Sequence, residues 1–494
     1  MIKMDDSEGT ECVLPGVGTL LGSAKEGVVV FRGIPFAAAP TGERRFAPPG
    51  PAPVWHGVRD TTVAAPIAPQ TPSRVYRHMG PFTAPQSEDC LSLTIWAPAE
   101  GKGPLPVVVW FHGGGFLTGG GALPWYDGSA LARRGLVVVA VNYRLGALGF
   151  LSVPGVLPGN LAILDQLAAL QWVKTHIPDL RGDPSLITVM GQSGGAHNIA
   201  SLLSLEASRG LFRRAILQSP PLGIGLMSAE DAAERGRVFL NALGLDGSAP
   251  NLLDRLRAVP IAEVLRAQTE AAQQLGNMSA GDLRPPFTPT ELAPHAGRIG
   301  NFMESAARAA AERGVEVLIG WTRDEANLFL GDDERTARLE AESLDRLARG
   351  IYGKQCTERL EEVRRRRPQG TAAQHFMDLV SDDAFRLPSV SFARMLASAG
   401  GRVFVYQFDW SPPDTRMGAC HCLELPFVFD SLAAWTDAAM LKGADATALR
   451  VLSGEMMSRW TKFIEIGDPG FPRWEGTSQP IFHFDVRSRL ERSP

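Results

Sequence analysis

The 494-residue sequence lacks several features that would assign it to a specialised class of proteins. Its longest apolar runs, such as LPVVVWF and GLVVVAVNY, are too short to span a bilayer and are typical of buried strands. The net charge of −4 leaves no basic surplus to bind nucleic acid or an anionic membrane. We therefore expect neither a nucleic-acid partner nor a membrane partner.

Cysteine is also scarce. Its five positions form an odd, scattered set, which is more typical of a reduced protein than of a disulfide framework. The acidic start of the chain has no apolar segment of the kind found in secretory signals, so we expect a cytoplasmic protein. Cys420 and Cys422 flank His421, but no second cluster supplies the other ligands of a zinc site. We expect no metal.

The remaining composition is that of a large folded enzyme. Hydrophobic residues make up 45% and charged residues 21% of the chain. Apolar strand-like runs alternate with helix-like periods, as at 105–111 and 160–176, which predicts a mostly parallel sheet covered by helices on both faces. We expect one α/β domain over residues 1–494. Two helix-rich segments, 221–300 and 333–397, are predicted to be cap insertions over the edge of the sheet that binds ligands.

A serine flanked by glycines is the most informative local pattern. The apolar run 187–190 predicts a buried strand, and the segment after Gly195 has helical spacing. Between them lies GQSGG, which is typical of the nucleophile elbow of α/β hydrolases. Ser193 is therefore the candidate nucleophile, although an ordinary loop is the alternative for this motif taken alone.

An activated serine needs a base and a carboxylate that orients it. The acid candidate is Glu325, in the turn after the strand-like run VEVLIG, and the base candidate is His421, after RVFVYQFDW. Both positions follow a predicted strand, as Ser193 does, so all three are expected at one edge of the sheet. Alternatively, Glu325 is a surface residue beside Asp324, and the base is one of the other eight histidines: His56, His78, His112, His176, His197, His295, His375 and His483.

A glycine-rich loop follows the strand at 105–111. In the run HGGGF, successive glycines can turn backbone N–H groups toward one point, and with the N–H of Gly194 they would form an oxyanion hole. Gly114 and Gly115 are the candidate donors in this loop. A flexible linker is the alternative, but its place after a buried strand argues against one. Nucleotide hydrolysis is not expected, because no phosphate-binding loop with its lysine is present.

Ten motifs recur along nearly the whole chain in the order of one protein family: FRGIPFAAAPTGERRFAPP, SEDCLSLTIW, VVWFHGGGF, NYRLGALGFL, GNLAILDQLAALQWV, RGDPSLITVMGQSGG, LFRRAILQSP, LIGWTRDE, HCLELPFVF and IGDPGFPRW. In these motifs the chain resembles the type-B carboxylesterases, which include para-nitrobenzyl esterases and cholinesterases. The resemblance implies an α/β-hydrolase fold, with Ser193, Glu325 and His421 as the catalytic triad and Gly114, Gly115 and Gly194 as oxyanion donors. Within the family, GQSGGA, AILQSPP and IGWTRDE are most similar to bacterial phenmedipham-type carbamate hydrolases.

The resemblance also implies roles outside the triad. It predicts structural ion pairs Arg45–Glu88 and Arg144–Asp165. Phe116 and Phe287 are candidate pocket walls, with plain core packing as an equal alternative. For Phe287 the resemblance adds support, because PPFTPTELAP matches the place of the family's acyl-pocket aromatics.

The departures from the family pattern are informative. Gln192 and Gly194 stand where the family usually has Glu and Ala, so a cationic substrate loses an attractive charge. The loop at 68–90 offers Tyr76 but no tryptophan to hold a quaternary ammonium, and we do not expect choline esters. Ala68 stands where the family's disulfide partner of Cys90 would be, which again favours a reducing compartment.

We therefore expect a serine hydrolase that cleaves small-molecule carboxylic esters through an acyl-enzyme on Ser193, with aryl carbamates as a possible second class of substrate. No cofactor is expected. The first alternative is a carbamate hydrolase or amidase with weak esterase activity. A second is a non-catalytic binding protein on the same fold. The sequence leaves monomer and homo-oligomer both open. The arginine run 364–367 is predicted to be a solvated helix C-terminus.

Overall fold

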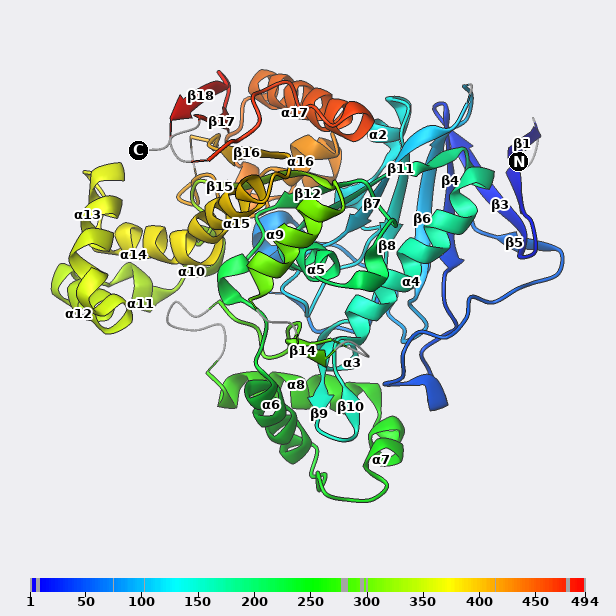
Figure 1. Ribbon diagram of the computed structural model, residues 1–494, viewed down its shortest axis with the longest axis horizontal. Helices are drawn as coiled ribbons and strands as arrows, with labels where there is room; N and C mark the ends of the chain where they lie inside the picture. The colour runs from blue at the N-terminus through cyan, green and yellow to red at the C-terminus, as the bar shows by residue number, and fades with distance from the viewer. Residues whose placement is uncertain are drawn as a thin grey trace.

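A 14-stranded sheet runs through the molecule, and helices cover both of its faces (Figure 1). Its central strands are parallel: β8 (Val137–Val141), β7 (Leu105–Phe111), β11 (Gly182–Gln192), β12 (Arg214–Gln218), β15 (Glu316–Thr322), β16 (Val403–Phe408) and β17 (Pro480–Phe484). The computed structural model describes residues 2–5, 9–73, 75–101, 103–276, 283–293, 297–298, 301–413, 415–476 and 480–492.

The edges of this sheet are antiparallel. On one side lie β1 (Ile2–Asp5), β2 (Gly9–Leu14), β3 (Gly18–Lys25), β4 (Val28–Pro35) and β6 (Ser92–Pro98), and on the other β18 (Arg489–Arg492). β5 (Val58–Asp60) pairs with β3. Two small hairpins lie outside the sheet: β9 (Ser152–Val153) with β10 (Leu157–Pro158), and β13 (Leu292–Ala293) with β14 (Gly297–Arg298).

Both faces of the central strands are buried, which explains their continuous apolar sequences. Side chains alternate along β7, so Val107 and Val109 enter one hydrophobic core while Val108 and Trp110 enter the other. One core is completed by α4 (Leu161–His176), α5 (Gly194–Leu203), α9 (Phe302–Glu312) and α15 (Leu387–Ser398). The other is completed by α2 (Ser129–Arg133), α16 (Leu425–Val428) and α17 (Ala446–Ile466). The α/β-hydrolase fold with helices on both faces is thus confirmed.

The two helix-rich segments form separate groups in Figure 1. The first holds α6 (Ala229–Ala242), α7 (Leu252–Ala258) and α8 (Ile261–Gln274), while its residues 277–282, 294–296 and 299–300 lie outside the described part of the chain. The second holds α11 (Glu334–Ala337), α12 (Ala341–Tyr352), α13 (Cys356–Arg366) and α14 (Ala372–Ser381). α12, α13 and α14 share a small apolar core, to which Ala326 and Leu330 also belong. α15, at the end of the second segment, packs instead against α9, β15 and β16.

The remaining short helices are α1 (Tyr76–Met79), α3 (Gly146–Phe150) and α10 (Asn327–Leu330). No helix in the ranges described is both long and apolar enough to cross a bilayer.

The arginine run at the end of α13 forms the solvated helix end that its composition predicts, and it also forms ion pairs. α13 ends at Arg366 and residues 364–366 are exposed, while Arg366 also pairs with the buried Asp382 at 2.5 Å. Arg367 bonds to both Asp378 (2.9 Å) and Asp324 (2.5 Å). These arginines therefore tie the second helical group to the turn that carries Glu325.

Candidate active site

The nucleophile candidate lies on a strained turn between β11 and α5. Ser193 has φ 55° and ψ −125°, in a region that residues with a side chain rarely adopt, and its N–H donates to the Gln218 carbonyl at 2.8 Å. A Cβ atom on Gly195 would lie 2.0 Å from the carbonyl oxygen of Phe111, so only glycine lets α5 approach β7 this closely. The motif GQSGG thus has the elbow geometry expected of it.

The acid and base candidates meet at the same edge of the sheet. Glu325 Oε2 lies 2.5 Å from His421 Nδ1, and both side chains are at least 98% buried. The other carboxylate oxygen accepts the N–H of Thr322 at 2.8 Å, which fixes the orientation of the group. Residues Asp324 and Cys420 form an isolated parallel bridge, so the two loops run side by side next to this pair.

The outer nitrogen of the imidazole faces Gln192. Gln192 Nε2 lies 3.0 Å from His421 Nε2 and 3.3 Å from Cys422 Sγ. With Nδ1–H donated to Glu325, Nε2 is the acceptor and the amide of Gln192 is the donor. Within the part of the chain that is described, the Ser193 hydroxyl makes no hydrogen bond. For a proton to pass from Ser193 to His421, the Nε2 atom would first have to leave the Gln192 amide and accept a hydrogen bond from the serine hydroxyl. The sequence marks Gln192 as a charge change but gives no sign of this contact.

Two of the alternatives, Asp324 for the acid and His197 for the base, have other partners. The Asp324 carboxylate is bonded to Arg367, Arg323 and the N–H of Ala419 (2.9 Å). His197 Nε2 lies 2.9 Å from the Gly225 carbonyl oxygen, and burial lowers its pKa to about 4. Of the remaining histidines, His295 lies outside the described residues.

The glycine loop after β7 has the backbone freedom that an oxyanion hole needs. Gly114 and Gly115 have φ values of 115° and 61°, and a Cβ on Gly114 would meet the Thr118 carbonyl oxygen at 2.0 Å. Gly194 is the first residue of α5, at the positive end of its dipole. Among the residues described, no hydrogen-bond acceptor takes the N–H of any of these three glycines, so these donors are available to a ligand.

Two phenylalanines that the sequence did not single out pack against His421. The ring centroids of Phe329 and Phe385 lie 5.1 and 5.0 Å from that of His421, and the two phenyl planes are within 4° of parallel. Phe385 belongs to a π-helix, η7 (Asp382–Arg386), between α14 and α15. π-helical turns are rare in proteins as a whole, but those that occur are frequently found at functional sites. They leave no recognisable pattern in a sequence.

The two phenylalanines suggested as pocket walls are both buried. Phe116 is 2% exposed and packs edge-on against Phe150 and His197, with centroid distances of 5.5 Å. Phe287 is also 2% exposed and lies against Phe239 of α6 at 5.6 Å. These contacts are those of core packing, the alternative weighed for both residues.

A second buried carboxylate lies next to the candidate triad. Glu424, three residues after His421, is 1% exposed and accepts a hydrogen bond from Gln218 Nε2 at 3.2 Å. Its burial, with the nearby charge of Glu325, raises the pKa of Glu424 to about 7. Its Oε2 atom has no partner among the described residues. Glu424 is a buried titratable group that sequence reasoning did not find.

The scaffold contacts implied by the family resemblance are present. Arg144 pairs with Asp165 through bonds of 2.6 and 2.8 Å, and both side chains are at least 97% buried. Arg45 pairs with Glu88 at 2.6 Å. Cys90 is a free, fully buried thiol, and burial raises its pKa. Across the described ranges, no three His, Cys, Asp or Glu side chains are grouped as they would be around a metal ion.

Comparisons with known proteins match nearly the full length of the chain. The family model described as Carboxylesterase family matches residues 10–489. The chain is 36% identical to a probable N-octanoylanthranilate hydrolase of Rhodococcus erythropolis, covering 94% of this chain and 95% of that protein. It is 35% identical to para-nitrobenzyl esterase of Bacillus subtilis (96% and 93% covered) and 33% identical to phenmedipham hydrolase of Pseudarthrobacter oxydans (92% and 89% covered).

The fold agrees as well. The structure of a thermophilic para-nitrobenzyl esterase superposes with a TM-score of 0.85 at 34% identity, and 98% of each chain is covered. The resemblance predicted from the motifs is therefore confirmed, and it includes both para-nitrobenzyl esterase and phenmedipham hydrolase relatives. The chain belongs to the carboxylesterase family, in which a serine forms an acyl-enzyme during hydrolysis.

Proposed function

We propose that Ser193, His421 and Glu325 are the nucleophile, base and acid of a serine hydrolase that cleaves carboxylic esters. The chain is a carboxylic ester hydrolase by family. The observation that carries the residue assignment is the Glu325–His421 bond of 2.5 Å, held at the edge of the sheet where the strained Ser193 turn also lies.

The first half of the reaction forms the acyl-enzyme. His421 Nε2 leaves Gln192 and accepts the proton of the Ser193 hydroxyl while the serine oxygen attacks the ester carbonyl carbon. The oxyanion receives hydrogen bonds from the N–H groups of Gly114, Gly115 and Gly194, which have no other acceptor among the described residues. When the C–O bond to the alcohol breaks, the imidazolium returns its proton to the leaving oxygen.

The second half releases the acid. Water gives a proton to His421 Nε2 and attacks the acyl carbon, and the same oxyanion donors hold the second tetrahedral intermediate. The bond to Ser193 then breaks, and the proton returns to the serine oxygen. Through both halves, the Glu325 carboxylate accepts the Nδ1–H of His421 and stabilises the imidazolium form.

The substrate class follows from the neutral residue beside the nucleophile and from the relatives. Gln192 places no negative charge next to the site, which favours uncharged esters over cationic ones. Relatives named for hydrolysis of phenmedipham and of N-octanoylanthranilate support carbamates or amides as a second candidate class. A non-catalytic role is disfavoured, because all three triad positions are filled and Glu325 and His421 are in contact.

We also propose how the rest of the chain serves this site. Residues 1–494 form one catalytic domain, and the helical segments 221–300 and 333–397 act as caps that shape access to Ser193. The free thiols of all five cysteines and the alanine at position 68 support a cytoplasmic, reducing environment.

The proposal is tested by labelling and turnover. The purified chain should react with a fluorophosphonate probe and hydrolyse p-nitrophenyl acetate, while Ser193→Ala should do neither and should unfold at the same temperature as the native chain. Labelling of Ser193→Ala would refute the assignment. Comparing kcat/KM on matched ester, carbamate and anilide substrates then separates esterase from carbamate hydrolase and amidase.

A further inference from the structure

The side chain of Gln192 lies between the glycine loop and the candidate base. Its amide nitrogen donates to His421 Nε2 at 3.0 Å and to Cys422 Sγ at 3.3 Å. On its other side, a Cβ atom on Gly113 would lie 2.5 Å from Gln192 Oε1, so the amide oxygen packs against the loop that carries two candidate oxyanion donors. Gln192 is only 1% exposed. These contacts orient the amide with its N–H groups toward the base.

This hydrogen bond occupies the atom that the reaction needs. With Nδ1–H donated to Glu325, Nε2 is the one acceptor of the neutral imidazole, and Gln192 takes it. When Nε2 receives the proton of Ser193 it becomes a donor, so the Gln192 N–H then faces another N–H group. Among the described residues, the weak acceptor Cys422 Sγ is the partner that remains. A buried donor without a good acceptor costs about fivefold or more in an equilibrium constant.

The leaving alcohol of an ester must pass next to the same donor. His421 Nε2 returns its proton to the leaving oxygen when the C–O bond breaks, so that oxygen has to come within hydrogen-bond distance of Nε2. Gln192 Nε2 is 3.0 Å from that atom. An oxygen acceptor that the alcohol carries close to its ester oxygen is therefore within reach of the Gln192 N–H. Phe329 and Phe385, which pack on the imidazole, have no polar side-chain atom to compete for it.

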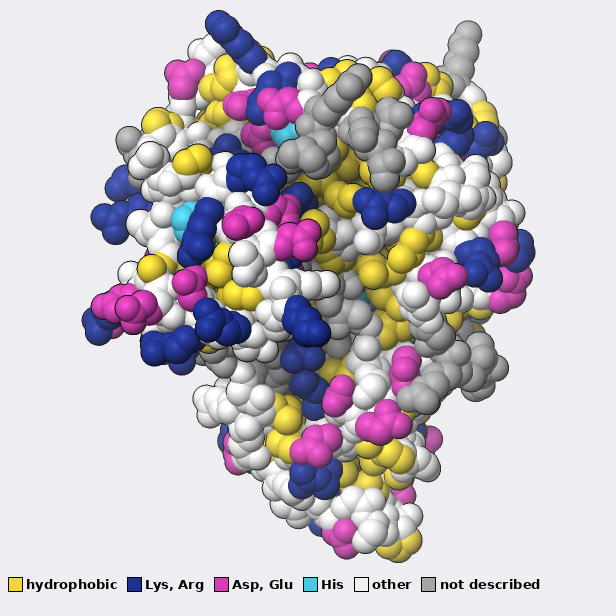
Figure 2. Space-filling view, turned by 60° about the vertical axis from the view of Figure 1, so that its left-hand side comes forward, with side chains coloured by type: hydrophobic (Ala, Val, Ile, Leu, Met, Phe, Trp, Pro, Cys, Tyr) yellow, Lys and Arg dark blue, Asp and Glu magenta, His cyan; other side chains and the backbone are white. Residues whose placement is uncertain are grey.

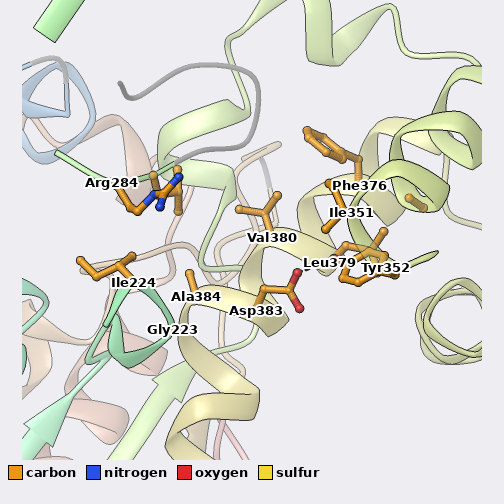
Figure 3. Close-up of a pocket in the computed structure, with 12 residues that line it drawn as sticks. Gly223, Ile224, Arg284, Ile351, Tyr352, Phe376, Leu379, Val380, Asp383 and Ala384 are labelled. Atoms are coloured by element: carbon orange, nitrogen blue, oxygen red, sulfur yellow. Dashed lines mark hydrogen bonds between the residues drawn. The ribbon is translucent and has the colours of Figure 1, made fainter. Parts of the chain in front are cut away.

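The cavity drawn in Figure 3 is separate from this contact. Its volume is about 480 Å³, and its walls come from η5 (Leu222–Ile224), α12, α14 and η7, together with Leu283 and Arg284. None of the lining residues that the structure describes is a candidate site residue. Basic and acidic side chains are interspersed over the face shown in Figure 2, which favours selection by short-range contacts over steering by charge. The hydrogen bond of Gln192 is such a short-range contact.

We propose that Gln192 blocks the base in the free enzyme and passes its hydrogen bond to an oxygen acceptor of the leaving alcohol when substrate binds. The inference rests on the function proposed above. Esters whose alcohol carries an ether or carbonyl oxygen near the ester oxygen satisfy the displaced N–H, whereas plain alkyl esters leave it without a strong acceptor. Gln192 thus selects for oxygen-bearing alcohols. One hydrogen bond changes an equilibrium about two- to tenfold, which sets the size of this preference.

The test compares two isosteric substrates, 2-methoxyethyl acetate and n-butyl acetate, with the full-length enzyme, and follows the release of acetic acid. Gln192→Met keeps the length of the side chain but removes its donor. The ratio of kcat/KM for the methoxyethyl ester to kcat/KM for the butyl ester should fall about two- to tenfold in this variant, with faster turnover of the butyl ester. Because the ether oxygen activates the leaving group equally in both enzymes, the change in this ratio reports the hydrogen bond.

Two further variants accompany Gln192→Met. Gln192→Leu removes the same donor with a side chain of different shape and should lower the ratio in the same way, so the result does not depend on how methionine packs. Gln166→Met makes the matched replacement at a fully buried glutamine of α4, and it should leave both kcat/KM values unchanged.

An unchanged or higher ratio in the Gln192 variants would overturn the inference. The same holds for an equal loss of activity on both acetates. Failure of the proposed function is a different outcome, because the native chain would then hydrolyse neither acetate and would not react with the fluorophosphonate probe.

Discussion

Replacing Glu325 by Gln should lower kcat for p-nitrophenyl acetate about ten thousandfold without unfolding the protein. The N–H of Thr322 donates to one oxygen of the carboxylate, so in the variant the amide oxygen takes that bond and the NH₂ group faces His421. An NH₂ group can only donate to Nδ1, which forces the imidazole proton onto Nε2. In that tautomer the ring cannot accept the Ser193 proton.

The magnitude follows from the charge that is lost. An imidazolium and a carboxylate about 4 Å apart between their charge centres interact by about 4 kcal/mol at an effective dielectric constant of about 20. A tenfold change in rate corresponds to about 1.4 kcal/mol, so the charge alone accounts for about three orders of magnitude. The wrong tautomer adds to this, in line with the roughly ten thousandfold loss known for the equivalent change in other serine hydrolases.

The neighbouring acid provides a matched control. Asp324 is as buried as Glu325, but it bonds to Arg367, Arg323 and the Ala419 N–H rather than to the imidazole. Asp324→Asn should therefore lower the unfolding temperature while changing kcat less than about tenfold. Steady-state kinetics and thermal unfolding of both variants test this. A loss of less than tenfold in Glu325→Gln, or an equal loss in Asp324→Asn, would refute the assignment of the acid.

Three further predictions concern charge. Gln192→Glu should raise the ratio of kcat/KM for a cationic ester to kcat/KM for its neutral isostere about tenfold or more, since two charges about 7 Å apart interact by about 2 kcal/mol. An unchanged ratio would show that residue 192 does not affect the choice between these substrates. Asp165→Asn leaves the buried Arg144 guanidinium uncompensated and should lower the free energy of unfolding by about 3–5 kcal/mol in urea titrations, whereas a loss below 1 kcal/mol would contradict a buried pair. Burial raises the pKa of Glu424 to about 7 in the folded protein, above the value of 4.5 that applies when the chain is unfolded. The folded state therefore keeps a proton that the unfolded state has already released. This group stabilises the fold at low pH, and its contribution is lost as pH rises through 7. The difference in unfolding free energy between Glu424→Gln and the native chain should therefore shift by about 3 kcal/mol in favour of the variant from pH 5 to pH 8. The same difference at both pH values would show that Glu424 does not titrate in this window.

Much of the sheet and the candidate triad could be predicted because their signals are local. β7 spans Leu105–Phe111, as its apolar run predicts, and the elbow after β11 needs glycines that are visible in the sequence. Glu325 and His421 are predicted to meet because each follows a strand, and parallel strands bring their C-terminal ends to one edge. The structure brings the two side chains into contact, while their roles as acid and base stay a prediction.

Contacts between side chains distant in sequence could not be predicted in this way. The contact of Gln192 with the base depends on the rotamers of two buried side chains, and the raised pKa of Glu424 depends on burial that no local pattern encodes. The partners of the arginine run could not be predicted for a related reason. Its composition predicts the exposed helix end that residues 364–366 form, but the acidic partners of Arg366 and Arg367 come from other segments of the chain.

The π-helix connects these observations, because α14, η7 and α15 form one continuous helical segment with three different surroundings. α14 belongs to the second helical group, η7 places Phe385 against His421, and α15 packs on the sheet beside β15 and β16. The wide turn is held by Asp382, which is 1% exposed and bonded to Arg366 and Arg386 at 2.5 Å each. Since a shift of this turn would move α14 and the ring of Phe385 together, the second helical group and the position of the candidate base are not structurally independent.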